Sequence, residues 1–169
     1  MSYAKLRNDL LATRDARQSA LDGFYAEGRW PTLVTLCLNI PGRDKNPEGS
    51  AGLWQFACDR LIPCLSPGQI LLETRDLLGP WLIAGCRVPA VTTKRWSLEI
   101  EMEFPAGRLL DIDVYGFAGK PLDRSSLGIA QRSCLVCSGS ARDCMRLGQH
   151  GPGEIQDRVN ELLRPFTKK

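Results

Sequence analysis

The chain has 169 residues, of which 43% are hydrophobic and 24% are charged, as in ordinary soluble globular proteins. A net charge of +3 is too small to indicate nucleic-acid binding, and no apolar run reaches the length of a membrane span. The N-terminal residues Met1–Arg7 contain no apolar signal core. We therefore expect a cytoplasmic protein without a membrane or nucleic-acid partner, folded as one domain over residues 1–169.

The first predicted elements are a helix and a strand. Apolar residues recur at roughly helical spacing over residues 5–27, and the β-forming residues 32–40 indicate a core strand. Arg14 and Arg17 are three positions apart in the helix and share a face. They could bind one anion together, or they could belong to a solvated charged face.

A polar loop follows the first strand. Residues 42–50 contain two glycines and begin with basic residues that include Lys45. A basic loop with glycines after a strand can hold phosphates, although this one matches no P-loop pattern. An ordinary surface loop is the alternative.

The middle of the chain continues with a helix and shorter apolar segments. Residues 51–65 are expected to form a second helix, and residues 70–76 a strand. The apolar segment 77–85 is interrupted by glycine and proline and predicts a strand or a tight loop. Residues 86–93 are expected to be irregular.

A strictly alternating segment comes next. Apolar and polar residues alternate over residues 95–104, which predicts a half-buried strand. Three residues connect it to the next apolar segment, so the two strands are expected to pair as a hairpin. The polar face would then carry Glu99 or Glu101 near the next strand, either as a metal ligand or as a solubilising residue.

Two aspartates lie in the strand expected over residues 107–114. Side chains alternate faces along a strand, so Asp111 and Asp113 point the same way, about 7 Å apart. Two carboxylates on one face of an apolar strand are costly unless a positive charge lies between them. Oxygen ligands and a phosphate suit Mg²⁺, and the pair therefore predicts a metal-dependent phosphoryl or nucleotidyl transfer site. Arg108 lies at its entrance, and Arg124 and Arg132 could bind an anion further along.

A cluster of cysteines with one histidine precedes a closing helix over residues 154–163. Cys134, Cys137, Cys144 and His150 follow the spacing Cys-x₂-Cys-x₆-Cys-x₅-His. Three thiolates and an imidazole can form a closed, structural zinc site. The thiols could instead pack as small apolar groups while the histidine orders a loop. A catalytic cysteine–histidine pair is less economical, because the aspartates already offer a chemistry.

Taken together, these motifs resemble one family, the apo-citrate lyase phosphoribosyl-dephospho-CoA transferases, also called holo-acyl-carrier-protein synthases of citrate lyase. The matching segments are Arg14-Asp15-x-Arg17, Gly107-Arg108-Leu109-x-Asp111-Ile112-Asp113-Val114 and Arg132-x-Cys134-Leu135-x-Cys137, with Arg124, Cys144 and His150. The family often has a histidine just before the proline of the turn, where this chain has Phe104. Any role of that histidine therefore cannot be carried over.

The resemblance implies a reaction and its partners. The donor would be 2′-(5″-triphosphoribosyl)-3′-dephospho-CoA, and the acceptor a serine of the apo acyl-carrier subunit of citrate lyase, with release of pyrophosphate. Asp111 and Asp113 would hold Mg²⁺, and Arg108, Arg14, Arg17 and Lys45, with Arg124 and Arg132, would bind the phosphate-rich donor. A similar transferase serves the carrier subunit of malonate decarboxylase, which is an alternative.

We expect an α/β (α+β) fold of nucleotidyltransferase type. The mixed sheet would have the Asp111 strand at its centre and helices packed on one side. The rival hypothesis is a zinc-stabilised module that binds a carrier protein without chemistry. In that case the two aspartates would merely face solvent.

Overall fold

The computed structural model describes residues 3–117 and 119–167 and contains one four-stranded sheet. Its strands are β1 (Thr32–Leu38), β2 (Gly68–Asp76), β3 (Gly79–Cys86) and β4 (Leu110–Tyr115), in the order β2-β3-β1-β4. All three strand pairs are antiparallel, so this sheet does not mix parallel and antiparallel strands as we expected. Across the part of the chain that the structure describes, no helix is both long and apolar enough to cross a membrane.

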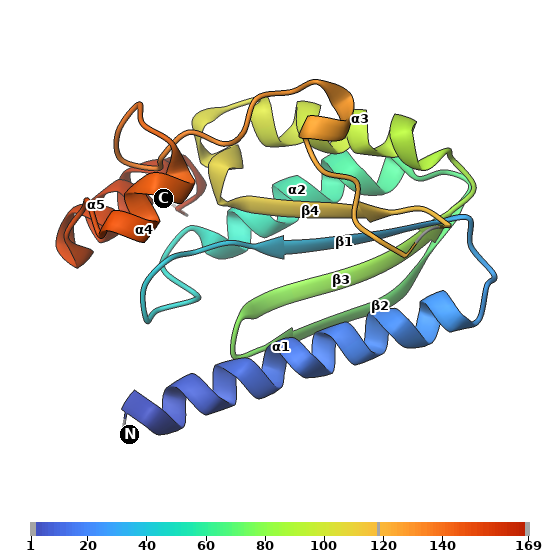
Figure 1. Cartoon of the computed structure of the whole chain (residues 1–169), viewed down its shortest axis with the longest axis horizontal. Coiled ribbons are helices and arrows are strands. Elements are labelled where there is room, and N and C mark those ends of the chain that lie inside the picture. Colours follow the sequence, from blue (N-terminus) through green and yellow to red (C-terminus); the bar gives the residue numbers. More distant parts are fainter. Residues whose placement is uncertain (1–2, 118, 168–169) are drawn as a thin grey trace.

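Helices cover both faces of this sheet (Figure 1). The helices are α1 (Tyr3–Ala26), α2 (Ser50–Cys64), α3 (Ala90–Met102), α4 (Ala141–Leu147) and α5 (Pro152–Leu163), with short 3₁₀ turns at Pro105–Leu109, Ser125–Leu127 and Arg164–Phe166. The expected α/β class is confirmed. The expectation of helices on one side only is wrong, because α1 lies across the sheet from α2 and α3.

Alternating side chains of the strands form two cores. Val34, Leu36 and Ile112 belong to the larger core, which packs against α2 and α5. Leu33 and Ile83 point the other way and pack against Leu21 of α1. Burial on both faces explains why β1 and β3 are largely apolar, with Thr32 and Thr35 as polar residues of β1.

The helices at 5–27, 51–65 and 154–163 and the strands at 32–40 and 70–76 are confirmed within a few residues. The segment 77–85 is a strand, β3, and it is buried along its length. Gly85 is needed there, because a Cβ atom would lie 2.4 Å from the ring of Trp30. Residues 86–93 are not wholly irregular, since α3 begins at Ala90.

The strand and hairpin expected from residues 95–104 are wrong, because most of this segment lies in helix α3. Its buried residues recur at helical spacing and include Lys94, Ser97 and Glu101. The apolar alternation was misleading because polar side chains occupy much of the buried face. Those polar side chains have partners: Ser97 Oγ, for example, donates to the carbonyl of Thr93 at 2.9 Å.

The Asp111 strand, β4, lies at the edge of the sheet, so our expectation that it lies at the centre is wrong. Helix α3 covers this edge. Lys94 Nζ donates to the carbonyl of Ile112 at 2.8 Å, and the amide of Ile112 donates to Glu101 Oε1 at 3.1 Å. Two buried charged side chains thus satisfy backbone groups that a neighbouring strand would otherwise pair.

Candidate active site

The two aspartates face α1 from strand β4. Burial alternates along the strand, so Asp111, Asp113 and Tyr115 share the half-buried face. In the antiparallel register Cys37 lies opposite Asp111, and Thr35 lies opposite Asp113. The acidic pair therefore continues onto the neighbouring strand as a polar strip.

The surroundings of Asp111 disfavour its charge. Desolvation by burial, and then the negative charge of Asp113, raise the pKa of Asp111, while Arg132 acts in the opposite direction. Cys37 Sγ lies 4.0 Å from Asp111 Oδ2, and burial together with the Asp111 charge raises the pKa of Cys37 to about 12. The thiol is therefore neutral, and the aspartate pair would be stabilised by a bound cation.

A cavity of about 300 Å³ lies between α1 and this face of the sheet. It is lined by Asp111 and by three of the predicted basic residues, Arg14, Arg17 and Lys45. Arg14 and Arg17 come from one face of α1, and Lys45 comes from the loop after β1. The structure thus brings one carboxylate and three cationic side chains from distant parts of the sequence to one cavity.

The three basic residues are held differently. Arg17 donates from Nε and Nη2 to the two oxygens of Asp76 at 2.7 and 2.6 Å, and its guanidinium lies over the ring of Trp81. Lys45 Nζ donates to the carbonyl of Ile40 at 2.6 Å. Arg14 is exposed and forms no ion pair with any residue in the described ranges. Arg17 is therefore fixed, whereas Arg14 is available to a ligand.

A second group of charges surrounds Glu101 at the outer edge of β4. Arg124 Nη2 donates to Glu101 Oε2 at 2.5 Å, and Arg132 Nη2 donates to Glu101 Oε1 at 2.6 Å. The same Nη2 of Arg132 lies 3.4 Å from Asp111 Oδ1. Arg132 thus connects the buried Glu101 to the aspartate that faces the cavity.

The remaining basic residue, Arg108, points toward the cysteine-bearing segment. Its Nη2 donates to the carbonyl of Ser133 at 2.6 Å. Gly107 beside it packs tightly on the end of α3, where a Cβ atom would lie 2.4 Å from the carbonyl oxygen of Glu101. The turn expected at Gly107 therefore packs closely against the end of α3. This packing fixes the backbone next to Arg108 and so the direction in which its side chain points.

The two glutamates lack the hairpin that was expected to bring them to the aspartates. Glu99 is exposed on α3, and both oxygens of Glu101 already accept hydrogen bonds. Within the described ranges, Asp111, Asp113 and these glutamates do not form a group of three acidic ligands. A magnesium site would therefore rest on Asp111 and Asp113, completed by oxygens of a substrate or water.

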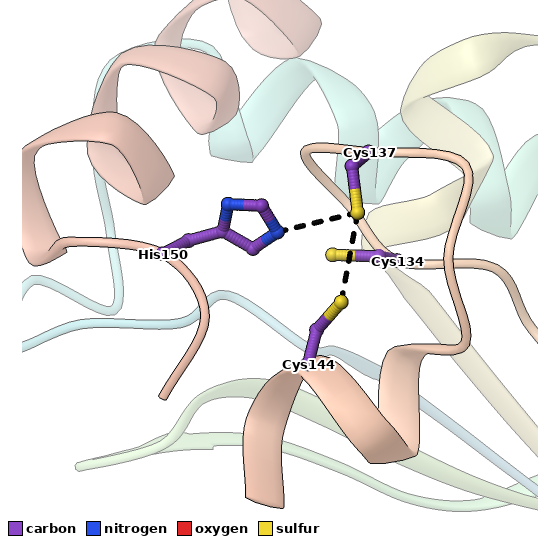
Figure 2. A group of neighbouring side chains, drawn as sticks. All are labelled: Cys134, Cys137, Cys144 and His150. Atoms are coloured by element: carbon purple, nitrogen blue, oxygen red, sulfur yellow. Dashed lines mark hydrogen bonds between the residues drawn. The ribbon is translucent and has the colours of Figure 1, made fainter. Parts of the chain in front are cut away.

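The four predicted sulfur and nitrogen ligands converge, as Figure 2 shows. One ligand atom from each of Cys134, Cys137, Cys144 and His150 lies within 4.8 Å of all the others. Cys137 Sγ is 3.5 Å from Cys144 Sγ and 3.3 Å from His150 Nε2. Tetrahedral zinc with bonds of about 2.3 Å needs sulfur atoms roughly 3.8 Å apart. The cluster can hold a metal ion.

Backbone and second-sphere contacts also suit a metal. The amides of Val136 and Gly139 donate to the sulfur atoms of Cys134 and Cys137, both at 3.4 Å. Burial opposes ionisation of Cys134, but hydrogen bonds from the Cys137 and Val136 amides outweigh it and lower its pKa to about 6. His150 Nδ1 lies 3.3 Å from Glu154 Oε2, a contact that turns Nε2 toward the sulfurs.

Several residues of the site were not predicted. Cys37, Trp81 and Tyr115 line the α1 cavity, Asp76 fixes Arg17, and Lys94 caps the edge of β4. One signal was available: Thr35 and Cys37 alternate in an otherwise apolar strand, in the same period as the two aspartates. The roles of Asp76 and Lys94 depend on contacts between distant segments.

The architecture is an α+β domain with an acidic strip facing a basic cavity and a separate thiol–imidazole cluster. A sequence profile of the family described as apo-citrate lyase phosphoribosyl-dephospho-CoA transferase matches residues 6–166, so the chain belongs to this family.

Individual relatives agree with this assignment. A protein of Citrobacter koseri named "Apo-citrate lyase phosphoribosyl-dephospho-CoA transferase" is 28% identical over 159 residues, covering 92% of this chain and 86% of the relative. A protein of Escherichia coli O139:H28 with the same name is 30% identical over 159 residues, with the same coverage. A protein of Streptococcus pyogenes serotype M18, named "Probable apo-citrate lyase phosphoribosyl-dephospho-CoA transferase", is 29% identical over 170 residues, covering 96% of this chain and 87% of the relative.

Proposed function

We propose that this protein attaches the 2′-(5″-phosphoribosyl)-3′-dephospho-CoA group to a serine of the apo acyl-carrier subunit of citrate lyase. The donor is the triphosphoribosyl precursor, and pyrophosphate is released. One observation carries the proposal: Asp111 faces a cavity whose walls include Arg14, Arg17 and Lys45. A triphosphate bound there would meet cationic side chains on one side and a carboxylate on the other.

Magnesium fits the acidic strip. Asp111 and Asp113 supply hard oxygen ligands, and the raised pKa of Asp111 reflects a charge that its surroundings do not fully compensate. Magnesium held by these two residues would neutralise charge on the α-phosphate and on the leaving pyrophosphate. Arg132 already lies 3.4 Å from Asp111 Oδ1 and would orient this carboxylate.

The protein's own groups account for the remaining steps. Arg14 and Lys45 bind the outer phosphates, while Arg17 is held by Asp76 and keeps the wall of the cavity in place. The serine oxygen attacks the α-phosphorus, a new P–O bond forms, and the bond to the β-phosphate oxygen breaks. The serine proton passes to a carboxylate of the aspartate pair, and the electrons of the broken bond leave with pyrophosphate.

The test is to change Asp111 and Asp113 to Asn, singly and together. Intact-mass analysis of the apo carrier protein should show the added prosthetic group with wild type, and a loss of at least roughly a hundredfold in initial rate with each variant. Asp59→Asn is the matched control, because Asp59 lies on α2 and contacts Gln55 on an exposed surface. A folded double variant with wild-type rates would contradict the proposal and favour a non-catalytic carrier-binding module.

The choice of carrier is tested in the same assay. The names of the relatives point to citrate lyase, so we expect its carrier subunit to be modified much faster than that of malonate decarboxylase. A faster reaction with the malonate decarboxylase subunit would reassign the acceptor and leave the chemistry intact.

We also propose a cytoplasmic, reducing location. The seven cysteines are all free thiols, which supports this proposal.

We also propose that the metal held by the cysteine cluster is zinc. Three sulfurs and one imidazole nitrogen complete a tetrahedral shell and leave no open position, so the role is structural. Elemental analysis of the purified protein should give about one zinc per chain, and Cys137→Ser should lower this value sharply. Purified protein that contains no zinc, and that melts at the same temperature with and without added zinc, would contradict this proposal.

A further inference from the structure

A second basic cavity lies beside the cavity under α1 and shares no lining residue with it. It has a volume of about 270 Å³, and its charged lining residues are Glu101, Arg108, Arg124 and Arg132. Two of these arginines form ion pairs with Glu101, at 2.5 and 2.6 Å. The cavity therefore collects three guanidinium groups around a single buried carboxylate.

The charges of this group do not cancel. Three guanidinium groups share two carboxylates, the buried Glu101 and Asp111, which lies 3.4 Å from Arg132, so an excess positive charge remains. Burial, and then the charges of Arg132 and Arg124, lower the pKa of Arg108, which is the effect of cations held close together. Arg108 forms no ion pair with any residue in the described ranges, and its buried Nε–H has no hydrogen-bond partner there. Such a group calls for a bound anion.

A neighbouring cavity is apolar and also includes Arg108. It has a volume of about 340 Å³, and Pro41, Leu135, Val136 and Ile155 contribute to its walls. Arg108 thus lies where a cationic surface meets an apolar one. A ligand that fits both has an anionic group joined directly to a partly apolar arm.

We propose that Arg108, Arg124 and Arg132 form a binding site for the internal diphosphate of the donor, separate from the site for its triphosphate. This inference rests on the proposed function and deepens it. The donor carries an anionic diphosphate between its adenosine and its pantetheine arm, which suits a group of cations in which Arg108 has no acidic partner among the described residues. The pantetheine arm then extends into the apolar cavity beside the cysteine cluster. Arg132, through its contact with Asp111, lies between the two phosphate sites.

The probe is dephospho-CoA, which has the diphosphate and the pantetheine arm but no triphosphoribosyl group. Its affinity is measured by titration calorimetry without added magnesium and without chelator, so that the cysteine cluster stays intact, and Arg108→Gln should weaken it by about tenfold to a hundredfold, the value of a charge-assisted hydrogen bond. Arg14→Gln, in the other cavity, should change it by less than about twofold. Arg108→Lys keeps the charge but loses the planar fork, and it should give an intermediate affinity.

A measurement on the wild type needs no substitution. Dephospho-CoA should shift the Nε–H resonance of Arg108 in an NMR titration, because this donor gains an acceptor. Inorganic pyrophosphate is the competing probe. If pyrophosphate displaces dephospho-CoA and loses affinity in Arg108→Gln, the site belongs to the leaving group and the assignment is overturned.

The remaining outcomes separate this site from the reaction itself. Unchanged dephospho-CoA affinity in Arg108→Gln, with an unshifted Nε–H in the wild type, would overturn the diphosphate site even if prosthetic-group transfer proceeds normally. A wild type that binds dephospho-CoA through Arg108 but modifies no carrier protein would overturn the transfer reaction and leave the diphosphate site standing. Arg108→Gln should also raise the KM for the donor about tenfold or more while pyrophosphate inhibition stays unchanged.

Discussion

The negative charge of Asp111 can bind a ligand, but it lowers the stability of the folded protein. Its carboxylate is half-buried beside Asp113, and the contact with Arg132 only partly offsets the loss of hydration. A residue kept in a costly state is expected where charge is needed for a ligand. The loss of stability caused by the Asp111 charge can be measured, because it disappears when a substitution removes that charge.

We expect Asp111→Asn to stabilise the metal-free protein at neutral pH while abolishing transfer. The folded-state pKa of Asp111 lies above its ordinary value of 3.8, so ionisation on raising the pH through the folded pKa costs the wild type stability. The melting temperature of the variant should exceed that of the wild type near pH 7 in chelator. The difference should shrink as the pH falls toward 3.8 and both chains become uncharged at this position. A variant that melts lower than wild type at pH 7 would contradict the prediction.

Glu101 has the opposite character, since its charge is compensated on all sides. It is 4% exposed and accepts hydrogen bonds from Arg124, Arg132 and the amide of Ile112. Glu101→Gln keeps the size but leaves Arg124 without a carboxylate and Arg132 with only the more distant Asp111, and it should cost about 3 kcal/mol of unfolding free energy. Urea denaturation measures this loss. Glu99→Gln, on the exposed face of the same helix, should change stability by no more than roughly 0.5 kcal/mol, and an equal loss in both variants would show that the Arg–Glu cluster is not responsible.

At the scale of elements, the cysteine segment and strand β4 are joined through Arg132 and Arg108. The carbonyl of Arg132 accepts from the amide of Ala141 at 3.2 Å, and the amide of Cys134 donates to the carbonyl of Gly139 at 2.6 Å. These bonds close the loop on which the cysteines lie. The same loop supplies the Ser133 carbonyl that accepts from Arg108. A metal in the cluster would therefore order this loop, and the loop would fix the positions of Arg108 and Arg132. The metal itself would not contact the substrate.

Metal removal is thus expected to act on the site from a distance. Chelation, or Cys134→Ser, should lower hydrogen-exchange protection of the Ala141 amide by about tenfold or more, equivalent to about 1.4 kcal/mol of local stability. The donor KM should rise in parallel. Cys64→Ser, on α2, is the control and should change neither quantity, because Cys64 lies outside the cluster. Unchanged protection of Ala141 after verified metal loss would show that the metal does not order the loop.

The sequence was informative where one physical requirement dominated a segment. The apolar strand β1, the periodic helix α5 and the alternation that puts Asp111 beside Asp113 all follow from burial patterns. Helix α3 was mistaken for a strand because Lys94 and Glu101 are buried to cap an edge strand, a need set by distant residues. The edge position of β4 could not be predicted from its own sequence, because strand order depends on contacts between distant segments. The convergence of the cysteines with His150 was suggested by their spacing, while the contact of Glu154 with His150 was not.

At the scale of the whole molecule, α1 forms one wall of the cavity that Asp111 faces, and residues near the middle of α1 attach it to the sheet. Leu21 packs on Leu33 and Ile83, and Arg17 reaches Asp76 at the end of β2. Asp76 in turn accepts from the amide of Leu78 at 2.8 Å in the turn between β2 and β3. The helix is thereby attached to the hairpin that is furthest from the edge strand β4.

Arg14 and Arg17 should therefore separate binding from stability although they lie on one helix. Arg17→Met breaks a bidentate, mostly buried ion pair with Asp76, and it should cost roughly 2 kcal/mol in urea denaturation. Arg14→Met removes an exposed charge and should leave stability within about 0.5 kcal/mol, while raising the donor KM by about tenfold. Asp76→Asn is the matched test of the clamp, because it should reproduce the stability loss of Arg17→Met, and the double variant should lose little more than either single one. Additive losses in that double variant would mean that α1 is held in place by its apolar contacts alone, and that Arg17 is as free as Arg14 to bind the donor.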